Sequence, residues 1–211
     1  MLQSLTVKGF ADELASNSPA PGGGSAAALA ASLGSALCSM VFNLTIGKKV
    51  YNEYDEDKKN LINSSLEEVK AQKDKFLMFM EKDAEEFLVL MDAFKLPKNT
   101  EEEKEYRLKK INEGYVKALE IPFEVAKKAF DIYKYVEIAA AYGNKNAISD
   151  AGVAALLLQT AIESAVLNVK INLSSVKDES YKAEVAHKCN SLIKEGLIRK
   201  EKIMEVVNSK L

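Results

Sequence analysis

The sequence has no tryptophan, one histidine and only two cysteines among its 211 residues. Two thiols so far apart, Cys38 and Cys189, are typical of a reducing compartment and argue against a disulfide framework. The single histidine, His187, lies beside Lys188 in a polar stretch, and no spacing of His, Cys and carboxylates resembles a metal site or a nucleophilic triad. Acid–base chemistry in this chain would therefore depend on a carboxylate.

The chain also lacks an excess of charge of one sign and a targeting segment. Its 29 basic and 31 acidic residues are interleaved and leave a net charge of −2, so no basic stripe exists to bind nucleic acid. No basic region followed by an apolar region opens the sequence, and we expect a cytoplasmic protein. The uncharged stretch 26–42 is mostly Ala, Ser and Gly; it is too weakly apolar to predict a membrane span and favours a buried helix.

Strand-like alternation is absent, and apolar residues recur at helical spacing instead, most clearly over residues 55–94. Turn and capping signals predict helices over residues 4–16, 25–46, 55–94, 100–119, 122–142, 151–176 and 178–211. With 47% apolar residues, the chain can fill one continuous core. We therefore predict a single all-α domain, residues 1–211: an up-and-down bundle of about seven helices with two central Ala-rich helices and one long helix.

Three of the ten glycines stand together in Pro21-Gly22-Gly23-Gly24-Ser25, where the second helix begins. Ser25 is predicted to cap that helix. Free backbone N–H groups at a positive helix end, with no side chains in the way, form a cradle for an anion or a polar ligand. A plain tight connection explains the motif equally well. It is not a Walker loop, because no strand precedes it and no Gly-Lys-Ser/Thr follows.

A polar stripe runs along the second Ala-rich helix, where Thr160, Ser164, Asn168 and Asn172 recur at steps of four. Buried asparagines need hydrogen-bond partners. The stripe is therefore either a hydrogen-bond ladder to another helix or subunit, or a wall that faces a ligand.

Asp83 lies at the edge of the apolar face of the long helix. Burial would raise its pKa and suit it to proton transfer, whereas a solvated rim residue is the alternative interpretation. If the second and third helices are antiparallel, the helical rise places Asp83 about 9 Å beyond the glycine turn. The same reasoning brings Asn168 and Asn172 to this end and leaves Asp150 about 27 to 33 Å away, where it would need another role or another subunit.

The motifs together closely resemble the cyclodeaminase/cyclohydrolase family, which includes the C-terminal domain of formiminotransferase-cyclodeaminase. Seven segments carry the resemblance in order: 19–25 (PAPGGGS), 43–49 (NLTIGKK), 83–87 (DAEEF), 96–100 (LPKNT), 143–144 (GN), 149–150 (SD) and 168–173 (NVKINL). The resemblance implies an all-α homodimer that acts on one-carbon tetrahydrofolates without a metal or other cofactor. It also implies that Asp83 is the catalytic residue. Substrate-binding residues are expected within the matching motifs: Gly22, Gly23, Gly24, Ser25, Asn43, Lys48, Asp150, Asn168 and Asn172.

The expected reaction converts 5-formiminotetrahydrofolate to 5,10-methenyltetrahydrofolate with release of ammonia. The alternative is methenyltetrahydrofolate cyclohydrolase activity, in which water opens the ring to the 10-formyl compound. Both reactions pass through a similar tetrahedral carbon, and the motifs do not separate them. A third reading, from a different class, is a non-enzymatic helical adaptor in which the polar stripe serves only assembly.

Overall fold

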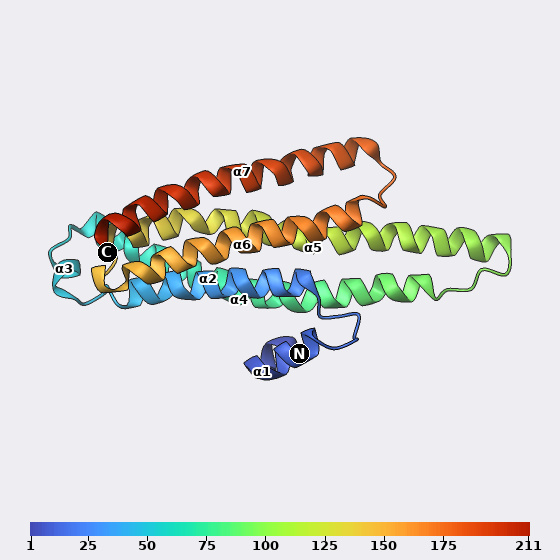
Figure 1. The fold of residues 1–211 in the computed structure, drawn as a ribbon, viewed down its shortest axis with the longest axis horizontal. Helices are drawn as coiled ribbons and strands as arrows, with labels where there is room; N and C mark the ends of the chain where they lie inside the picture. The colour runs from blue at the N-terminus through green and yellow to red at the C-terminus, as the bar shows by residue number, and fades with distance from the viewer.

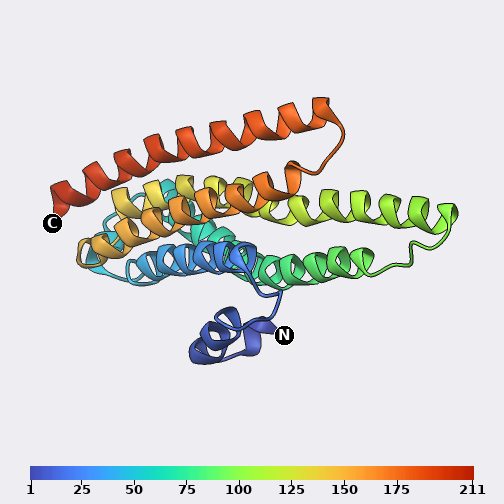
Figure 2. The same ribbon diagram turned by 45° about the vertical axis from the view of Figure 1, so that its right-hand side comes forward.

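Five long helices run along the length of the molecule, and no strand is present (Figure 1). The structure is a computed structural model that describes all residues, 1–211. The long helices are α2 (Gly23–Asn43), α4 (Glu56–Phe94), α5 (Glu101–Tyr142), α6 (Ile148–Leu173) and α7 (Glu179–Lys210). Four short elements complete the chain: η1 (Leu2–Ser4), α1 (Val7–Leu14), α3 (Lys49–Asn52) and η2 (Lys145–Ala147). Figure 2 shows that α1 lies off the bundle, so the all-α bundle prediction is confirmed for the rest of the chain.

The two Ala-rich helices, α2 and α6, pack directly against each other in the centre of the bundle. Their small residues allow a close approach: a Cβ atom on Gly34 would lie 3.2 Å from the Ala154 carbonyl oxygen. By length and composition both helices could also span a membrane, but 61% and 56% of the two apolar windows are buried inside the protein. Both are therefore core helices of the bundle, as the sequence predicts.

Helix α5 differs from the prediction, because residues 101–142 form one helix that continues through Pro122. Proline lacks the N–H group that would bond to the carbonyl four residues earlier, here that of Ala118. In this structure the Asn172 side chain of α6 donates to the Ala118 carbonyl oxygen instead, at 3.2 Å. The partner that compensates for Pro122 thus comes from another helix, and the predicted break at residues 119–122 is wrong.

Capping signals predict some helix starts correctly and others not. The capping box of Thr100 and Glu103 begins α5, and Asp178 caps α7. The N-cap of α2, however, is Gly22, and no side chain of the preceding loop caps this helix. Helix α6 begins at Ile148, so Ser149 and Asp150 lie in its first turn rather than capping it.

Candidate active site

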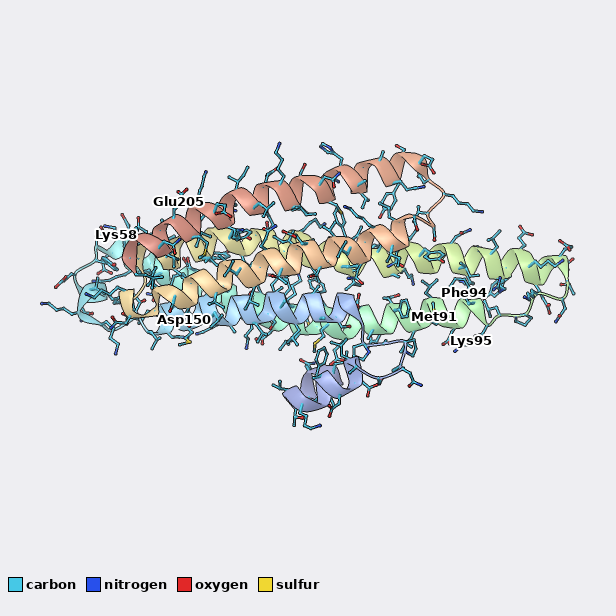
Figure 3. The ribbon with its side chains drawn as sticks, in the orientation of Figure 1. Lys58, Met91, Phe94, Lys95, Asp150 and Glu205 are labelled. Carbon is cyan, nitrogen blue, oxygen red and sulfur yellow. The ribbon has the colours of Figure 1, made fainter.

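A cavity of about 450 Å³ opens where α2 begins, between α2, α4, α5 and α6. Its size falls in the range of small-molecule sites. One side is polar and consists of Gly22, Gly23, Gly24, Asp83, Asn168 and Asn172; the other is apolar and consists mainly of Phe87, Leu90, Met91, Phe94, Tyr115 and Ile171. Figure 3 places Met91 and Phe94 on the part of α4 that runs beyond the start of α2.

Asp83 projects from α4 against the first turn of α2. The hydroxyl group of Ser25 donates to Asp83 Oδ2 at 3.0 Å. Asp83 thus brings a carboxylate from another helix to the N-terminus of α2, where the preceding loop provides no side-chain cap. A Cβ atom on Gly24 would lie 2.1 Å from Asp83 Oδ1, so a glycine is required at position 24.

The position of Asp83 differs from the sequence prediction by nearly two helical turns, because Asp83 contacts the glycine turn instead of lying about 9 Å beyond it. The cause is the connection between α2 and α4. Helix α2 ends at Asn43 rather than Ile46, and the connection forms the short helix α3, which lies past the end of α2 (Figure 1). Helix α4 consequently begins further out, and its later residues align with the start of α2.

Burial raises the pKa of Asp83 above the ordinary value of an aspartate, and the hydrogen bonds from Ser25 oppose this effect only in part. The protonated form is therefore more accessible than in a solvated aspartate. A half-buried carboxylate at the wall of a cavity can accept a proton from one ligand atom and return it to another. The alternative of a fully solvated rim residue is not compatible with this burial.

The two asparagines of the polar stripe lie on the cavity wall, next to the glycine turn. A Cβ atom on Gly23 would lie 3.2 Å from Asn168 Nδ2. Asn168 donates its amide N–H to the Ser164 carbonyl oxygen at 2.9 Å, and Asn172 donates to the carbonyl oxygens of Asn168 and Ala118. The backbone thus occupies both N–H groups of the Asn172 amide and one of the two on Asn168, while the side-chain carbonyl oxygens accept no hydrogen bond from the protein. Of the stripe, Asn172 links α6 to α5, and both asparagines line the cavity.

Four of the predicted substrate-binding residues do not line the cavity in this chain. Ser25 is fully buried behind the cavity wall and reaches it only through Asp83. Asn43, Lys48 and Asp150 lie at the opposite end of the bundle, where Figure 3 shows Asp150 far from Met91 and Phe94. Asn168 follows Asp150 on the same helix at a distance of about 27 Å by helical rise. A binding role for these three residues would require another subunit.

The apolar wall of the cavity is the part of the site that the sequence did not reveal. Phe87, Met91 and Phe94 follow helical spacing and were expected to be core residues. They line a cavity because α4 and α5 extend beyond the start of α2, so that no helix covers this part of their facing sides. No cluster of three or more His, Cys, Asp or Glu side chains suited to a metal ion occurs in the structure.

A family model and two proteins of known name match the sequence of this chain. Residues 6–191 match the family model described as formiminotransferase-cyclodeaminase. The chain is 40% identical over the full length of both sequences to a methenyltetrahydrofolate cyclohydrolase of Methylorubrum extorquens. It is 35% identical to the formimidoyltransferase-cyclodeaminase of mouse over 92% of this chain, but spans only 35% of that longer protein.

A solved structure shares the fold. The crystal structure of formiminotetrahydrofolate cyclodeaminase from Thermotoga maritima superimposes with a TM-score of 0.79 and 27% sequence identity, covering 100% of this chain and 98% of the other. The resemblance inferred from the seven motifs is thus confirmed. From the family match and the full-length relative together, the chain belongs to the formiminotransferase-cyclodeaminase family.

Proposed function

We propose that this enzyme converts 5-formiminotetrahydrofolate to 5,10-methenyltetrahydrofolate with release of ammonia, and that Asp83 carries the protons. The observation that supports this most directly is the half-buried Asp83 carboxyl, with its raised pKa, on the wall of a cavity that is polar on one side and aromatic on the other. N10 of the folate attacks the formimino carbon and forms the new C–N bond. The bond to the amino group then breaks.

Protons must move during this exchange, because N10 loses one and the departing amine gains one. Asp83 in its ionised form can accept the first proton and deliver it to the amine. The reaction as written requires no metal and no other cofactor, since the folate carries the one-carbon unit itself. Asp83 is the only carboxylate among the residues that line the cavity.

The cavity walls suit a reduced folate. The aromatic side chains of Phe87, Phe94 and Tyr115 can pack against a flat ring system. The side-chain carbonyl oxygens of Asn168 and Asn172 can accept hydrogen bonds from the N–H groups of a pterin. Because both N–H groups of the Asn172 amide are already bonded, we expect Asn172 to act only as an acceptor, whereas Asn168 keeps one free N–H group and can also donate.

The second candidate reaction is hydrolysis of 5,10-methenyltetrahydrofolate to 10-formyltetrahydrofolate. The 40% identity with the full-length cyclohydrolase of Methylorubrum extorquens favours it. Here water attacks the methenyl carbon, the bond from that carbon to N5 breaks, and Asp83 would transfer a proton from the water to N5. The same cavity serves both reactions.

Absorbance of the methenyl compound distinguishes the two reactions. With 5-formiminotetrahydrofolate it should rise in the presence of the enzyme, whereas with 5,10-methenyltetrahydrofolate it should fall if the chain is a hydrolase. Calorimetric titration with a stable tetrahydrofolate analogue tests the adaptor reading at the same time. A well-folded protein that binds no folate and changes neither absorbance would contradict both proposed reactions.

We further propose that the enzyme is a cytoplasmic homodimer that associates through the outer face of α2 and α6. Large apolar side chains are exposed there, including Leu33, Leu167 (67% exposed) and Ile171 (71% exposed). Exposed apolar surface of this kind is typical of an interface. Analytical ultracentrifugation should give twice the chain mass of 23.2 kDa, and a Leu167→Glu change should shift the protein toward the monomer.

A further inference from the structure

Ser25 occupies a position between two acceptors, one on the backbone and one on the proposed catalytic residue. Its Oγ lies 3.0 Å from the Met80 carbonyl oxygen and 3.0 Å from Asp83 Oδ2. We infer that Ser25 is a positioning residue, whose hydroxyl group holds the Asp83 carboxyl in one orientation in both of its protonation states. This inference rests on the proposed function, in which Asp83 must gain and lose a proton during each turnover.

The hydroxyl group has one proton and can therefore donate to only one of the two acceptors at a time. When Asp83 is ionised, the Ser25 O–H donates to Oδ2, as the geometry permits at 3.0 Å. When Asp83 is protonated, the carboxyl O–H can donate to Ser25 Oγ, while the Ser25 O–H turns to the Met80 carbonyl oxygen at 3.0 Å. Rotation of a single hydroxyl group thus keeps Asp83 Oδ2 bonded to Ser25 Oγ in both states, so Asp83 need not move when it titrates.

The surroundings restrict Ser25 to this role. Its side chain is 0% exposed and does not line the cavity, so it cannot contact a bound folate. Asp83 in turn cannot move toward the backbone of α2, because its Oδ1 already occupies the place where a Cβ atom of residue 24 would lie. The carboxyl group is thus held between a glycine and a hydroxyl group.

Ser32 provides a matched control on the same two helices. It is also buried on α2, and its hydroxyl group donates to a carbonyl oxygen of α4, that of Lys73, at 3.0 Å. It differs from Ser25 in one respect, because no carboxylate lies within reach of a hydrogen bond. Ser32→Ala and Ser25→Ala therefore remove the same kind of bond between helices, and only the second changes the surroundings of Asp83.

The first test measures Asp83 directly and does not depend on the reaction. Carbon-13 NMR of the labelled Asp83 carboxyl should show a higher pKa in the Ser25→Ala protein than in the unchanged protein, because the bond that Ser25 donates to the ionised form is charge-assisted and stronger than the bond it accepts from the protonated form. Ser32→Ala should leave that pKa unchanged. An unchanged pKa in Ser25→Ala would overturn the inference, even if neither folate proved to be a substrate.

The second test measures turnover with whichever folate is converted. Ser25→Ala should lower kcat by about 10- to 100-fold, the effect of losing a hydrogen bond to a charged group, with KM changed less than threefold. The apparent pKa of its pH–rate profile should move in the same direction as the NMR value. Ser32→Ala should keep kcat within about twofold, as expected when no transition-state interaction is lost.

Two further variants separate positioning from general damage to the fold. Ser25→Thr retains the hydroxyl group and should recover most of kcat, provided that its circular dichroism matches that of the unchanged protein. In an Asp83→Asn background, Ser25→Ala should cause no further loss, because Ser25 acts through Asp83. Equal losses of kcat in Ser25→Ala and Ser32→Ala, or additive losses in the double variant, would contradict the inference.

Discussion

At the two ends of the helical bundle, polar side chains of similar kinds differ in whether the protein itself provides their hydrogen-bond partners. At the end away from the cavity, Thr45 donates to the Val41 carbonyl oxygen at 2.6 Å and accepts from the Asn144 backbone N–H at 2.8 Å. The Asn144 side chain donates to the Leu44 carbonyl oxygen and accepts from the Asn146 backbone N–H. Both side chains thus donate to the chain and accept from it.

At the cavity end, the protein provides acceptors for the asparagine side chains but no donors. Asn168 and Asn172 donate to backbone carbonyls, while their oxygens face no protein donor. Asp83 accepts from Ser25 and also lines the cavity. Segments from both ends carry the family resemblance, yet the oxygens of Thr45 and Asn144 accept from the protein and those of Asn168 and Asn172 do not. Complete pairing therefore indicates a structural role, and partial pairing beside a cavity indicates a site for a ligand.

Among these variants, Asp83→Asn should cause the largest loss of activity. Removal of the proton-carrying group should lower kcat by about 10²- to 10⁴-fold, while folate binding measured by calorimetry is largely kept. Steady-state kinetics with both folates provides the measurement. Near-normal turnover in this variant would show that another group carries the protons.

Gly24→Ala should have the next largest effect on activity, because its Cβ atom would lie 2.1 Å from Asp83 Oδ1 and would displace the carboxyl group. A misplacement of about 1 Å can reduce kcat by about 10²-fold. Gly22→Ala adds the same methyl group to the cavity wall without a clash, since no atom lies within 4 Å of a Cβ atom there, and so measures the effect of the methyl group alone. Equal activity in the two variants would argue against tight seating of Asp83.

Pro122→Ala should weaken substrate binding without lowering the stability of the fold. The new N–H group of residue 122 can bond to the Ala118 carbonyl oxygen, so the Asn172 amide loses its partner on α5. We expect KM to rise by about 2- to 10-fold, the effect of one neutral hydrogen bond, while the free energy of unfolding does not fall. A variant that is less stable and has an unchanged KM would contradict this account.

Thr45→Val, at the opposite end of the bundle, should lower stability and leave activity nearly unchanged. It leaves the Asn144 backbone N–H without its acceptor, and we expect the free energy of unfolding to fall by about 1 to 3 kcal/mol. Urea denaturation measures this loss. The kcat value should stay within about twofold of the unchanged protein, since no interaction with the transition state is removed. A large loss of kcat would show that the two ends are not independent.

The smallest expected effect is on the pH dependence of stability. Because the pKa of Asp83 is raised by folding, the folded state binds this proton more tightly than the unfolded state. The free energy of unfolding should therefore decrease as pH rises from the ordinary aspartate pKa, about 3.9, through the raised value in the folded protein. Urea denaturation across this range should show that component in the unchanged protein and not in Asp83→Asn.

Local signals in the sequence predict the local features of this fold. The periodicity of residues 55–94 and the caps at Thr100 and Asp178 each depend on neighbours within a few residues, and the structure confirms them. The predicted break at Pro122 was wrong because the compensating donor, Asn172, lies 54 residues after its acceptor, Ala118, and only the folded bundle brings the two together.

The arrangement of the site could be predicted only in part for the same reason. Helical rise placed Asp83 near the glycine turn but nearly two turns too far, since the short helix α3 was not expected. Ser25 resembled an N-cap in sequence, yet the N-cap is Gly22, and the Ser25 hydroxyl group bonds to a carboxylate of α4. The apolar cavity wall depends on how far two helices extend beyond a third, which no single helix pattern encodes.

The bond between Asn172 and Ala118 also has an evolutionary consequence. An acceptor on one helix is available only because position 122 holds a residue without an N–H group, and a donor on another helix has come to use it. Without the proline, the asparagine competes with a backbone N–H group for this carbonyl oxygen. Without the asparagine, the carbonyl oxygen lacks this donor. Among relatives, positions 122 and 172 should therefore change together, and a lineage that replaces the proline should no longer be constrained to retain the asparagine.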